Sequence, residues 1–184
     1  MLMKKNEVYI SVDIEASGPV PGEYSMLSVG ACVVYDTAQT FYAELKPLNQ
    51  QFVPAALKVA GLSLSELAET GLEPRVGMTQ FEQWVQTVAN GDKPVFVAFN
   101  ATFDWMFTTY YFHRFLGRNP FGISGLDVKA YYMGKLDTSW GQTTKQNIKP
   151  RFMSKRKHTH NALDDALEQA ELFRNLLEHE KCLA

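Results

Sequence analysis

The sequence has 184 residues, a length that suits a single domain spanning 1–184. Apolar residues make up 46% of it and charged residues 21%, the balance of an ordinary globular protein. The net charge of −2 excludes a global positive field, so any attraction to nucleic acid must come from a local group of cations.

The two cysteines and the apolar segments indicate a compartment. Cys32 lies in an apolar run typical of a core, and Cys182 lies in the tail, so no disulfide framework is expected. Lys4 and Lys5 precede only a short run that soon meets an acid, which differs from a signal peptide. No apolar stretch approaches the ~20 residues of a membrane span. We expect a cytoplasmic protein without a membrane partner.

The first part of the chain predicts three strands. Residues 8–14 alternate β-branched and aromatic side chains, 26–35 form a continuous apolar run with one glycine, and 40–45 alternate again. A loop rich in Gly and Pro at 17–22 separates the first two strands. Because the connections are short, the three strands are expected to pair as an antiparallel meander.

Helices and short buried strands alternate in the rest of the chain. The predicted elements are, in order, helices at 54–60, 64–70 and 78–89, a buried strand at 94–99, a helix at 102–116, a last strand near Ile123, a helix from its cap Asp127 to Gly134, and a helix at 161–180. This order predicts an α/β fold with a mixed sheet and helices on both faces.

Two acids interrupt the first apolar strand. Asp13 and Glu15 are two positions apart, so both side chains point to the same face of the sheet. Two adjacent carboxylates on a central strand are costly unless a positive charge lies between them, and oxygen ligands favour Mg²⁺ or Mn²⁺. An edge strand with two solvated acids is the alternative.

A third acid follows the buried strand at 94–99. Thr102 is a natural N-cap, which places Asp104 in the first turn of the next helix. The helix dipole is expected to lower the pKa of this carboxyl and to keep it ionised for binding a metal. Alternatively, Asp104 only complements the dipole.

The last helix begins with a histidine and two aspartates. At ~100° per residue, Asp165 falls within the margin of the apolar arc, so it should face the sheet. Asp164 falls among the residues expected to face water: Glu168, Glu171, Asn175 and Glu178. A core-facing aspartate near His160 implies a shared partner, although a dipole pair beside an exposed histidine remains the alternative.

In this order, the motifs resemble the DEDDh branch of the DnaQ-like exonuclease family, which includes RNase T and polymerase proofreading subunits. The family pattern is Asp-x-Glu on the first strand, an aspartate after the fourth, and His-x4-Asp at the last helix. The matching residues are Asp13, Glu15, Asp104, His160 and Asp165. The flanking residues are also similar, since 15–18 resembles Glu-x-Thr-Gly and 100–104 resembles Asn-Ala-x-Phe-Asp.

The resemblance spans 8–177, with one visible departure. Phe99 stands where the family often has histidine, and we expect this change to alter substrate contacts but not metal binding. The sister branch with a catalytic tyrosine is excluded, because the position of that tyrosine is Asn161.

The resemblance implies an RNase H-like five-stranded sheet and two-metal hydrolysis that releases 5′-mononucleotides from single-stranded DNA or RNA 3′ ends. It implies that two Mg²⁺ or Mn²⁺ ions are held by Asp13, Glu15, Asp104 and Asp165. His160 would be the general base. The substrate contacts expected from the family motifs are the backbones of Ala16 and Ser17, close approach at Gly18, and Asn100.

Two further features fit a nucleic-acid substrate. No acid lies between 137 and 164, but six cations do: Lys145, Lys149, Arg151, Lys155, Arg156 and Lys157. The last three are predicted to bind phosphates near His160, although a mobile, solvated loop is equally compatible. Phe103, at the start of a helix, is predicted to stack on or wedge beside a base.

Two alternatives share the fold. A non-catalytic binding module would have lost an acid or the histidine, and none is lost here. A proofreading subunit would depend on a polymerase partner, but the chain ends shortly after its last helix and shows no docking segment. The sequence leaves open the choice between DNA and RNA, and a homodimer is also possible.

Overall fold

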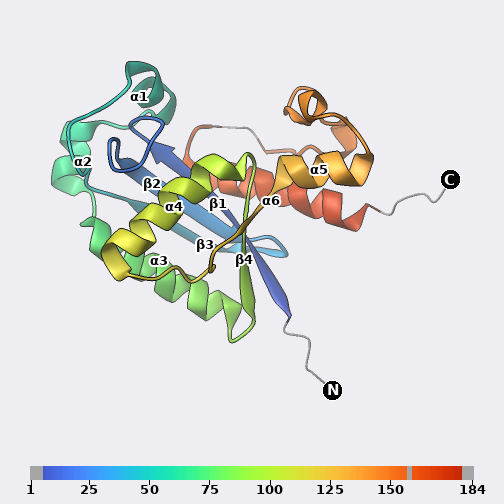
Figure 1. The fold of residues 1–184 in the computed structure, drawn as a ribbon, viewed down its shortest axis with the longest axis horizontal. Coiled ribbons are helices and arrows are strands. Elements are labelled where there is room, and N and C mark those ends of the chain that lie inside the picture. Colours follow the sequence, from blue (N-terminus) through green and yellow to red (C-terminus); the bar gives the residue numbers. More distant parts are fainter. Residues whose placement is uncertain (1–5, 157–158, 180–184) are drawn as a thin grey trace.

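A five-stranded mixed sheet forms the centre of the protein (Figure 1). The computed structural model describes residues 6–156 and 159–179. The strand order is β3-β2-β1-β4-β5, with β1 (Glu7–Ala16), β2 (Met26–Val33), β3 (Asp36–Glu44), β4 (Lys93–Ala98) and β5 (Gly125–Asp127). The first three strands are antiparallel, and β4 and β5 are added in parallel. This arrangement confirms the predicted sheet.

Helices cover both faces of the sheet, as predicted (Figure 1). They are α1 (Pro54–Ala60), α2 (Leu64–Thr70), α3 (Pro74–Ala89), α4 (Ala101–Leu116), α5 (Val128–Leu136) and α6 (Ala162–Glu178), with two 3₁₀ turns, η1 (Trp140–Thr143) and η2 (Pro150–Phe152). One apolar core packs α3 and α4 against the sheet through Phe81 and Phe107. A second core packs α5 and α6 against the opposite face through Tyr132 and Phe173.

The helix and strand boundaries differ from the predicted ones in a few places. The helix predicted from Met78 begins at Pro74, because proline is well suited to the first turn of a helix. The last strand does not include Ile123, whose side chain is 96% exposed, and instead begins at Gly125. Cys32 is buried, as predicted, whereas Cys182 lies outside the described residues. None of the helices in the described ranges is long and apolar enough to cross a membrane.

The carboxyl ends of β1 and β4 define where a site can form. The two strands are parallel and adjacent, and β2 and β3 lie only on the far side of β1. α4 begins directly after β4, and the first turn of α6 lies over β1 and β2. In open α/β sheets, ligands bind at such carboxyl ends, so this edge is the expected place for a functional site.

Candidate active site

β1 carries two acids to its carboxyl end. Asp13 pairs with Gly30 of β2, and Glu15 pairs with Ser28, so both side chains lie on the face that α6 covers. The register shifts between Glu15 and Ala16, which marks an irregularity where the strand leaves the sheet. The strand is central and not an edge strand, so the alternative of two solvated edge acids is wrong.

α4 brings the third acid to the same edge. Asp104 lies in the first turn of α4, is 4% exposed, and accepts a hydrogen bond from the Ile14 backbone nitrogen at 3.1 Å. The N-cap is Asn100, in the left-handed region at φ 68°, and not Thr102 as predicted. The Asn100 side chain makes no capping hydrogen bond, and the Ala101 N–H at the start of the helix donates to the Asp127 carboxylate at 2.6 Å. A carboxylate of the neighbouring strand β5 therefore satisfies one of the free N–H groups in the first turn of α4.

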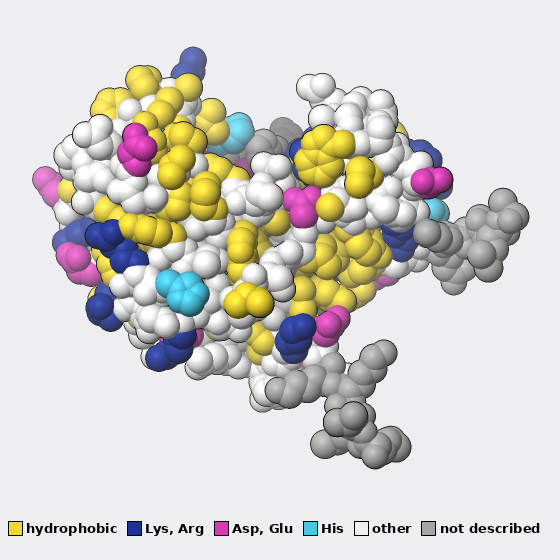
Figure 2. All heavy atoms as spheres, in the orientation of Figure 1, with side chains coloured by type: hydrophobic (Ala, Val, Ile, Leu, Met, Phe, Trp, Pro, Cys, Tyr) yellow, Lys and Arg dark blue, Asp and Glu magenta, His cyan; other side chains and the backbone are white. Residues whose placement is uncertain are grey.

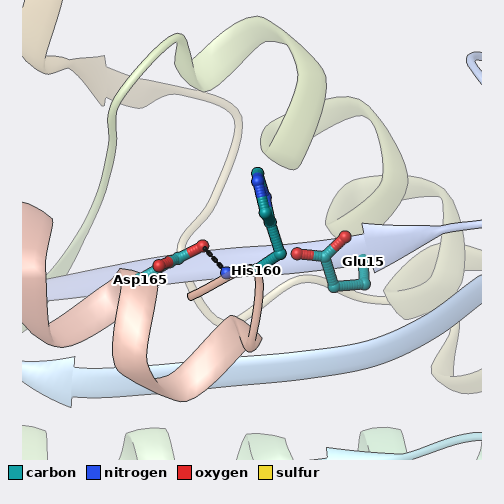
Figure 3. Close-up of side chains that lie close together, drawn as sticks. All are labelled: Glu15, His160 and Asp165. Atoms are coloured by element: carbon teal, nitrogen blue, oxygen red, sulfur yellow. Dashed lines mark hydrogen bonds between the residues drawn. The ribbon is translucent and has the colours of Figure 1, made fainter. Parts of the chain in front are cut away.

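α6 supplies the fourth acid and the histidine. Asp165 is 3% exposed and Asp164 is exposed, as the helical periodicity predicted. The Asp165 carboxylate accepts hydrogen bonds from the backbone nitrogens of Thr159 and His160, each at 3.1 Å. Figure 3 shows the His160 side chain rising between Asp165 and Glu15. The backbone of His160 is left-handed at φ 57°, and a ring nitrogen lies within 4.8 Å of carboxylate oxygens of Glu15 and Asp165.

A glycine of β2 allows α6 to begin so close to the sheet. A Cβ at Gly30 would lie 2.2 Å from the Leu163 backbone nitrogen and 2.3 Å from the Ala162 carbonyl carbon. No side chain fits there, so Gly30 sets the depth at which Asp165 faces Asp13. The sequence showed a glycine inside an apolar run, but only the partner helix reveals its role.

Burial and mutual repulsion dominate the electrostatics of the acids. Desolvation raises the pKa of Asp13 well above its ordinary value, and neighbouring charges raise it further: Asp104, Glu15 and Asp165. The Lys145 ammonium opposes this shift. Burial also raises the pKa of Asp104 to about 8 and that of Glu15 to about 7. The predicted lowering of the Asp104 pKa by the helix dipole is wrong, because burial outweighs the favourable backbone hydrogen bonds.

This donor set fits divalent cations. The raised pKa values show that carboxylates gather here at a cost that a positive counter-charge would relieve. Ligand atoms of Glu15, His160 and Asp165 all lie within 4.8 Å of one another. Carboxylate oxygens are the ligands that Mg²⁺ and Mn²⁺ prefer. The carboxylates could bind a metal without a histidine. The His160 imidazole adds a group that can accept a proton.

An apolar pocket of about 390 Å³ opens beside Glu15. Its lining residues come from the end of β1 and the loop after it, from α1 and its N-cap, and from α4: Glu15, Ala16, Gly18, Pro19, Val53, Ala56, Val59 and Phe103. Figure 2 shows hydrophobic side chains gathered over the α1 end of the molecule. The pocket therefore places Phe103, Ala16 and Gly18 next to the acids, whereas Asn100 is exposed at the start of α4.

Ser17 has a structural role that the sequence did not reveal. Its backbone nitrogen donates to the Ser25 carbonyl at 2.9 Å, and its carbonyl accepts from the Val53 nitrogen at 2.8 Å. Its buried hydroxyl donates to the Gln51 carbonyl at 2.8 Å. These bonds hold the Ser17 backbone within the loop, and the contact between this backbone and substrate stays a prediction. A Cβ at Gly18 would lie 2.3 Å from the Tyr24 ring, so this glycine serves packing within the loop.

The basic segment packs onto α6. Lys145 forms an ion pair with Glu168 at 2.5 Å, and Arg156 forms one with Glu171 at 2.7 Å. Glu168, predicted to face water, is instead 4% exposed, and its carboxylate pairs with this lysine. The segment is therefore folded against the protein at these two points and is not simply solvated. Lys155 is exposed, and Lys157 lies outside the described residues.

No family model matches the chain. It is 49% identical over 169 residues to the 3′–5′ DNA exonuclease Cap18 of Escherichia coli, a match that covers 91% of this chain and 90% of that protein. Its fold resembles the nuclease domain of 3′hExo, a DEDDh family member bound to rAMP, with a TM-score of 0.75, 14% identity and 92% of each chain covered.

A second solved structure with the same fold is cell-death related nuclease 4 (CRN-4), with a TM-score of 0.71, 16% identity, and coverage of 92% of this chain and 63% of that one. E. coli Exonuclease I in complex with a dT13 oligonucleotide matches with a TM-score of 0.67, 16% identity, and coverage of 94% of this chain and 41% of that one. DEDDh nucleases depend on divalent metals, in agreement with the donor set described above. The chain belongs to the DEDDh-type 3′→5′ exonucleases, a family of hydrolases.

Proposed function

We propose that this exonuclease removes nucleotides from the 3′ end of single-stranded DNA, with four carboxylates holding two Mg²⁺ or Mn²⁺ ions and His160 as general base. One observation carries the proposal: acids from β1, α4 and α6 meet at one edge of the sheet, and Asp165 holds the His160 backbone there. The 49% identical relative is a DNA exonuclease, which favours DNA over RNA as the substrate.

The four carboxylates have different supports. Asp13 and Glu15 are fixed by the central strand, Asp104 by its hydrogen bond from the Ile14 nitrogen, and Asp165 by two backbone N–H groups. When bound between them, two divalent ions polarise the scissile phosphate and lower the pKa of an attacking water. Each carboxylate keeps a lone pair for a metal, because each oxygen offers about two acceptor sites.

His160 is the group that moves the proton. Its exposed imidazole accepts the proton of the attacking water while the new bond from water oxygen to phosphorus forms. The bond from phosphorus to the 3′-oxygen of the preceding nucleotide breaks, this oxygen takes a proton from solvent and becomes the new 3′-hydroxyl, and the product is a 5′-mononucleotide. A general base of this kind contributes about 10²–10⁴-fold to a rate.

The terminal base is placed by the apolar pocket. Phe103 and the apolar side chains of α1 and its preceding residue offer a surface against which a base stacks, next to Glu15. Ala16 and Gly18 line the same pocket, and Asn100 stands at the start of α4. Lys155 and Arg156 would contact phosphates of the strand. Arg156 would do so while it keeps its ion pair with Glu171. Residues 1–184 would form one cytoplasmic exonuclease domain.

The test uses 5′-labelled single-stranded DNA and RNA of equal sequence, with Mg²⁺, Mn²⁺ or chelator. Asp13→Ala, His160→Ala and the exposed neighbour Asp164→Asn are compared with the wild type. We expect a ladder that shortens from the 3′ end, faster on DNA, abolished by chelator and by the first two substitutions, and retained in Asp164→Asn. Intact oligonucleotides with the folded wild type in Mg²⁺ and Mn²⁺ would overturn the proposal. Faster cleavage of RNA than of DNA would overturn the assignment of DNA as the substrate.

A further inference from the structure

β1 and β4 separate just before the acids. Their parallel pairing runs from Glu7 opposite Lys93 to Ser11 opposite Val97. Among the described residues, the two strands form no residue pair after this one. Beyond this point, β1 continues to Asp13 and Glu15, while β4 turns away into α4. The strands must separate to admit the site, but separation removes the ladder hydrogen bonds that would fix their spacing.

One buried side chain spans this separation. The Gln169 Nε2 donates to the Val12 carbonyl of β1 at 2.7 Å, and its Oε1 accepts from the Phe99 backbone nitrogen after β4 at 2.7 Å. Gln169 is 2% exposed. Because the Val12 carbonyl can only accept and the Phe99 N–H can only donate, a neutral amide is required, and its orientation is fixed.

The position of this amide connects it to three of the acids. Val12 directly precedes Asp13, and Phe99 precedes the left-handed turn that leads to Asp104. Gln169 lies four residues after Asp165, which places both side chains on the same face of α6. A single helix face therefore supplies one acid and links the backbones that carry two others.

We propose that Gln169 is a positioning residue that holds β1 and β4 at the separation needed by Asp13, Asp104 and Asp165, and so sets the affinity of the site for divalent cations. This inference rests on the proposed metal-binding role of those three acids. The amide does not touch substrate. It acts by fixing the backbones on either side of the site.

A matched control separates this role from ordinary core stabilisation. Ser11 is fully buried, and its hydroxyl donates to the Ala166 carbonyl at 2.8 Å, so it also links β1 to α6. It lies where β1 and β4 are still paired. Ser11→Ala thus removes a comparable buried hydrogen bond at the same interface without acting on the separated strands.

The experiment compares Gln169→Met, of similar length but without an amide, with Ser11→Ala and the wild type. Mn²⁺ binding is measured by calorimetry without substrate, the exchange of the Phe99 amide hydrogen by NMR, and kcat and KM over a Mn²⁺ series. Removing a group that orients a metal ligand typically weakens metal affinity or activity by about 10–100-fold. We expect Gln169→Met to bind Mn²⁺ at least about tenfold more weakly. The Phe99 amide hydrogen should exchange faster, and kcat should fall with little change in KM.

Ser11→Ala should show a lower unfolding temperature but wild-type Mn²⁺ binding. Equal Mn²⁺ affinity in Gln169→Met and Ser11→Ala would overturn the inference. If Gln169→Met does not fold, Gln169→Glu serves instead, because its carboxylate can accept from Phe99 but, when ionised, cannot donate to Val12. Unchanged Mn²⁺ binding in that variant would equally contradict the role. Absence of nuclease activity in the wild type would defeat the proposed function alone, since calorimetry and exchange still test Gln169.

Discussion

α4 and α6 begin at the same site in contrasting ways. Each start follows a residue with a left-handed backbone, Asn100 or His160, and each has a buried aspartate in its first turn. Asp104 binds the backbone of β1, 90 residues away in the chain. Asp165 accepts from the backbones of Thr159 and His160, which precede the N-cap of its own helix.

This difference assigns different mechanical roles to the two aspartates. Asp104 joins α4 to the central strand, so its position is set by the core. Asp165 instead holds the segment that carries the proposed general base, so the placement of His160 depends on a carboxylate that is also proposed to bind metal. The start of α4 is therefore anchored to the sheet. At the start of α6, metal binding by Asp165 would be coupled to the placement of His160.

The largest effects should come from removing either aspartate. Asp104→Ala and Asp165→Ala should each lower kcat/KM on labelled oligonucleotides by on the order of 10³-fold, because each removes a proposed metal ligand. Hydrogen exchange should then separate them. Asp165→Ala should expose the Thr159 and His160 amides, and Asp104→Ala the Ile14 amide. Identical exchange patterns would contradict the contrast between the two helix starts.

His160→Ala should lower kcat by about 10²–10⁴-fold, because the water loses its proton acceptor. The backbone N–H of residue 160 remains in the variant, so its bond to Asp165 should persist. Calorimetry with Mn²⁺ checks this, and binding within about threefold of wild type is the expected result, since an imidazole acting as base contributes little to metal affinity. A large loss of Mn²⁺ binding would instead identify His160 as a metal ligand.

Gly30→Ala should disturb the packing of the start of α6 against the sheet and leave the start of α4 unchanged. The new Cβ would meet backbone atoms of residues 162 and 163, which cannot move without shifting the whole helix start. We expect destabilisation of about 1–3 kcal/mol, the usual cost of overpacking, and a fall in activity of about tenfold or more from a displaced ligand. Denaturant unfolding and kinetics measure both, with Gly134→Ala as the control because a Cβ there meets nothing within 4 Å. Full activity in Gly30→Ala would show that the approach of α6 is not critical.

The smallest effect concerns stability without metal. The pKa of Asp104 is raised to about 8 when folded, from an ordinary value of 3.8. The folded state therefore binds more protons than the unfolded state, and stability falls as pH rises between these two values. Asp104→Asn should remove this loss and stabilise the protein at pH 8 in chelator by about 2 kcal/mol, with no gain near pH 4.

Thermal unfolding at the two pH values in chelator measures this difference. Saturating Mg²⁺ should stabilise the wild type and remove the advantage of the variant, because only the folded wild type offers the complete site. A variant less stable than wild type at pH 8 would contradict the account of the acids as mutually repelling and buried.

The sequence predicted those parts of the molecule that depend on local periodicity. Alternation and apolar arcs were enough for the first four strands, most helices and the inward direction of Asp165. They failed for Glu168, because the lysine that pairs with this buried carboxylate lies 23 residues away in the chain. They also missed the hydrogen bond from the Ala101 N–H to Asp127, because Asp127 belongs to another strand.

The sequence indicated the five candidate site residues and their order along the chain. It did not indicate which residues hold them in place. Gly30 and Gln169 act through backbone atoms of distant elements, and nothing in their neighbouring residues signals this. The pKa of Asp104 could not be predicted from its place in a helix, since burial by the surrounding fold outweighs the local dipole. Long-range contacts thus decide the features that the sequence could not show.

The most direct test of the central claim is a crystal structure of the protein soaked with Mn²⁺ and a nucleoside 5′-monophosphate, with anomalous scattering used to locate the ions. We predict two anomalous peaks among Asp13, Glu15, Asp104 and Asp165, with the base against Phe103 and the His160 ring facing the phosphate. Anomalous density elsewhere, or none between these acids at saturating Mn²⁺, would contradict the assignment of this edge of the sheet as the hydrolytic site.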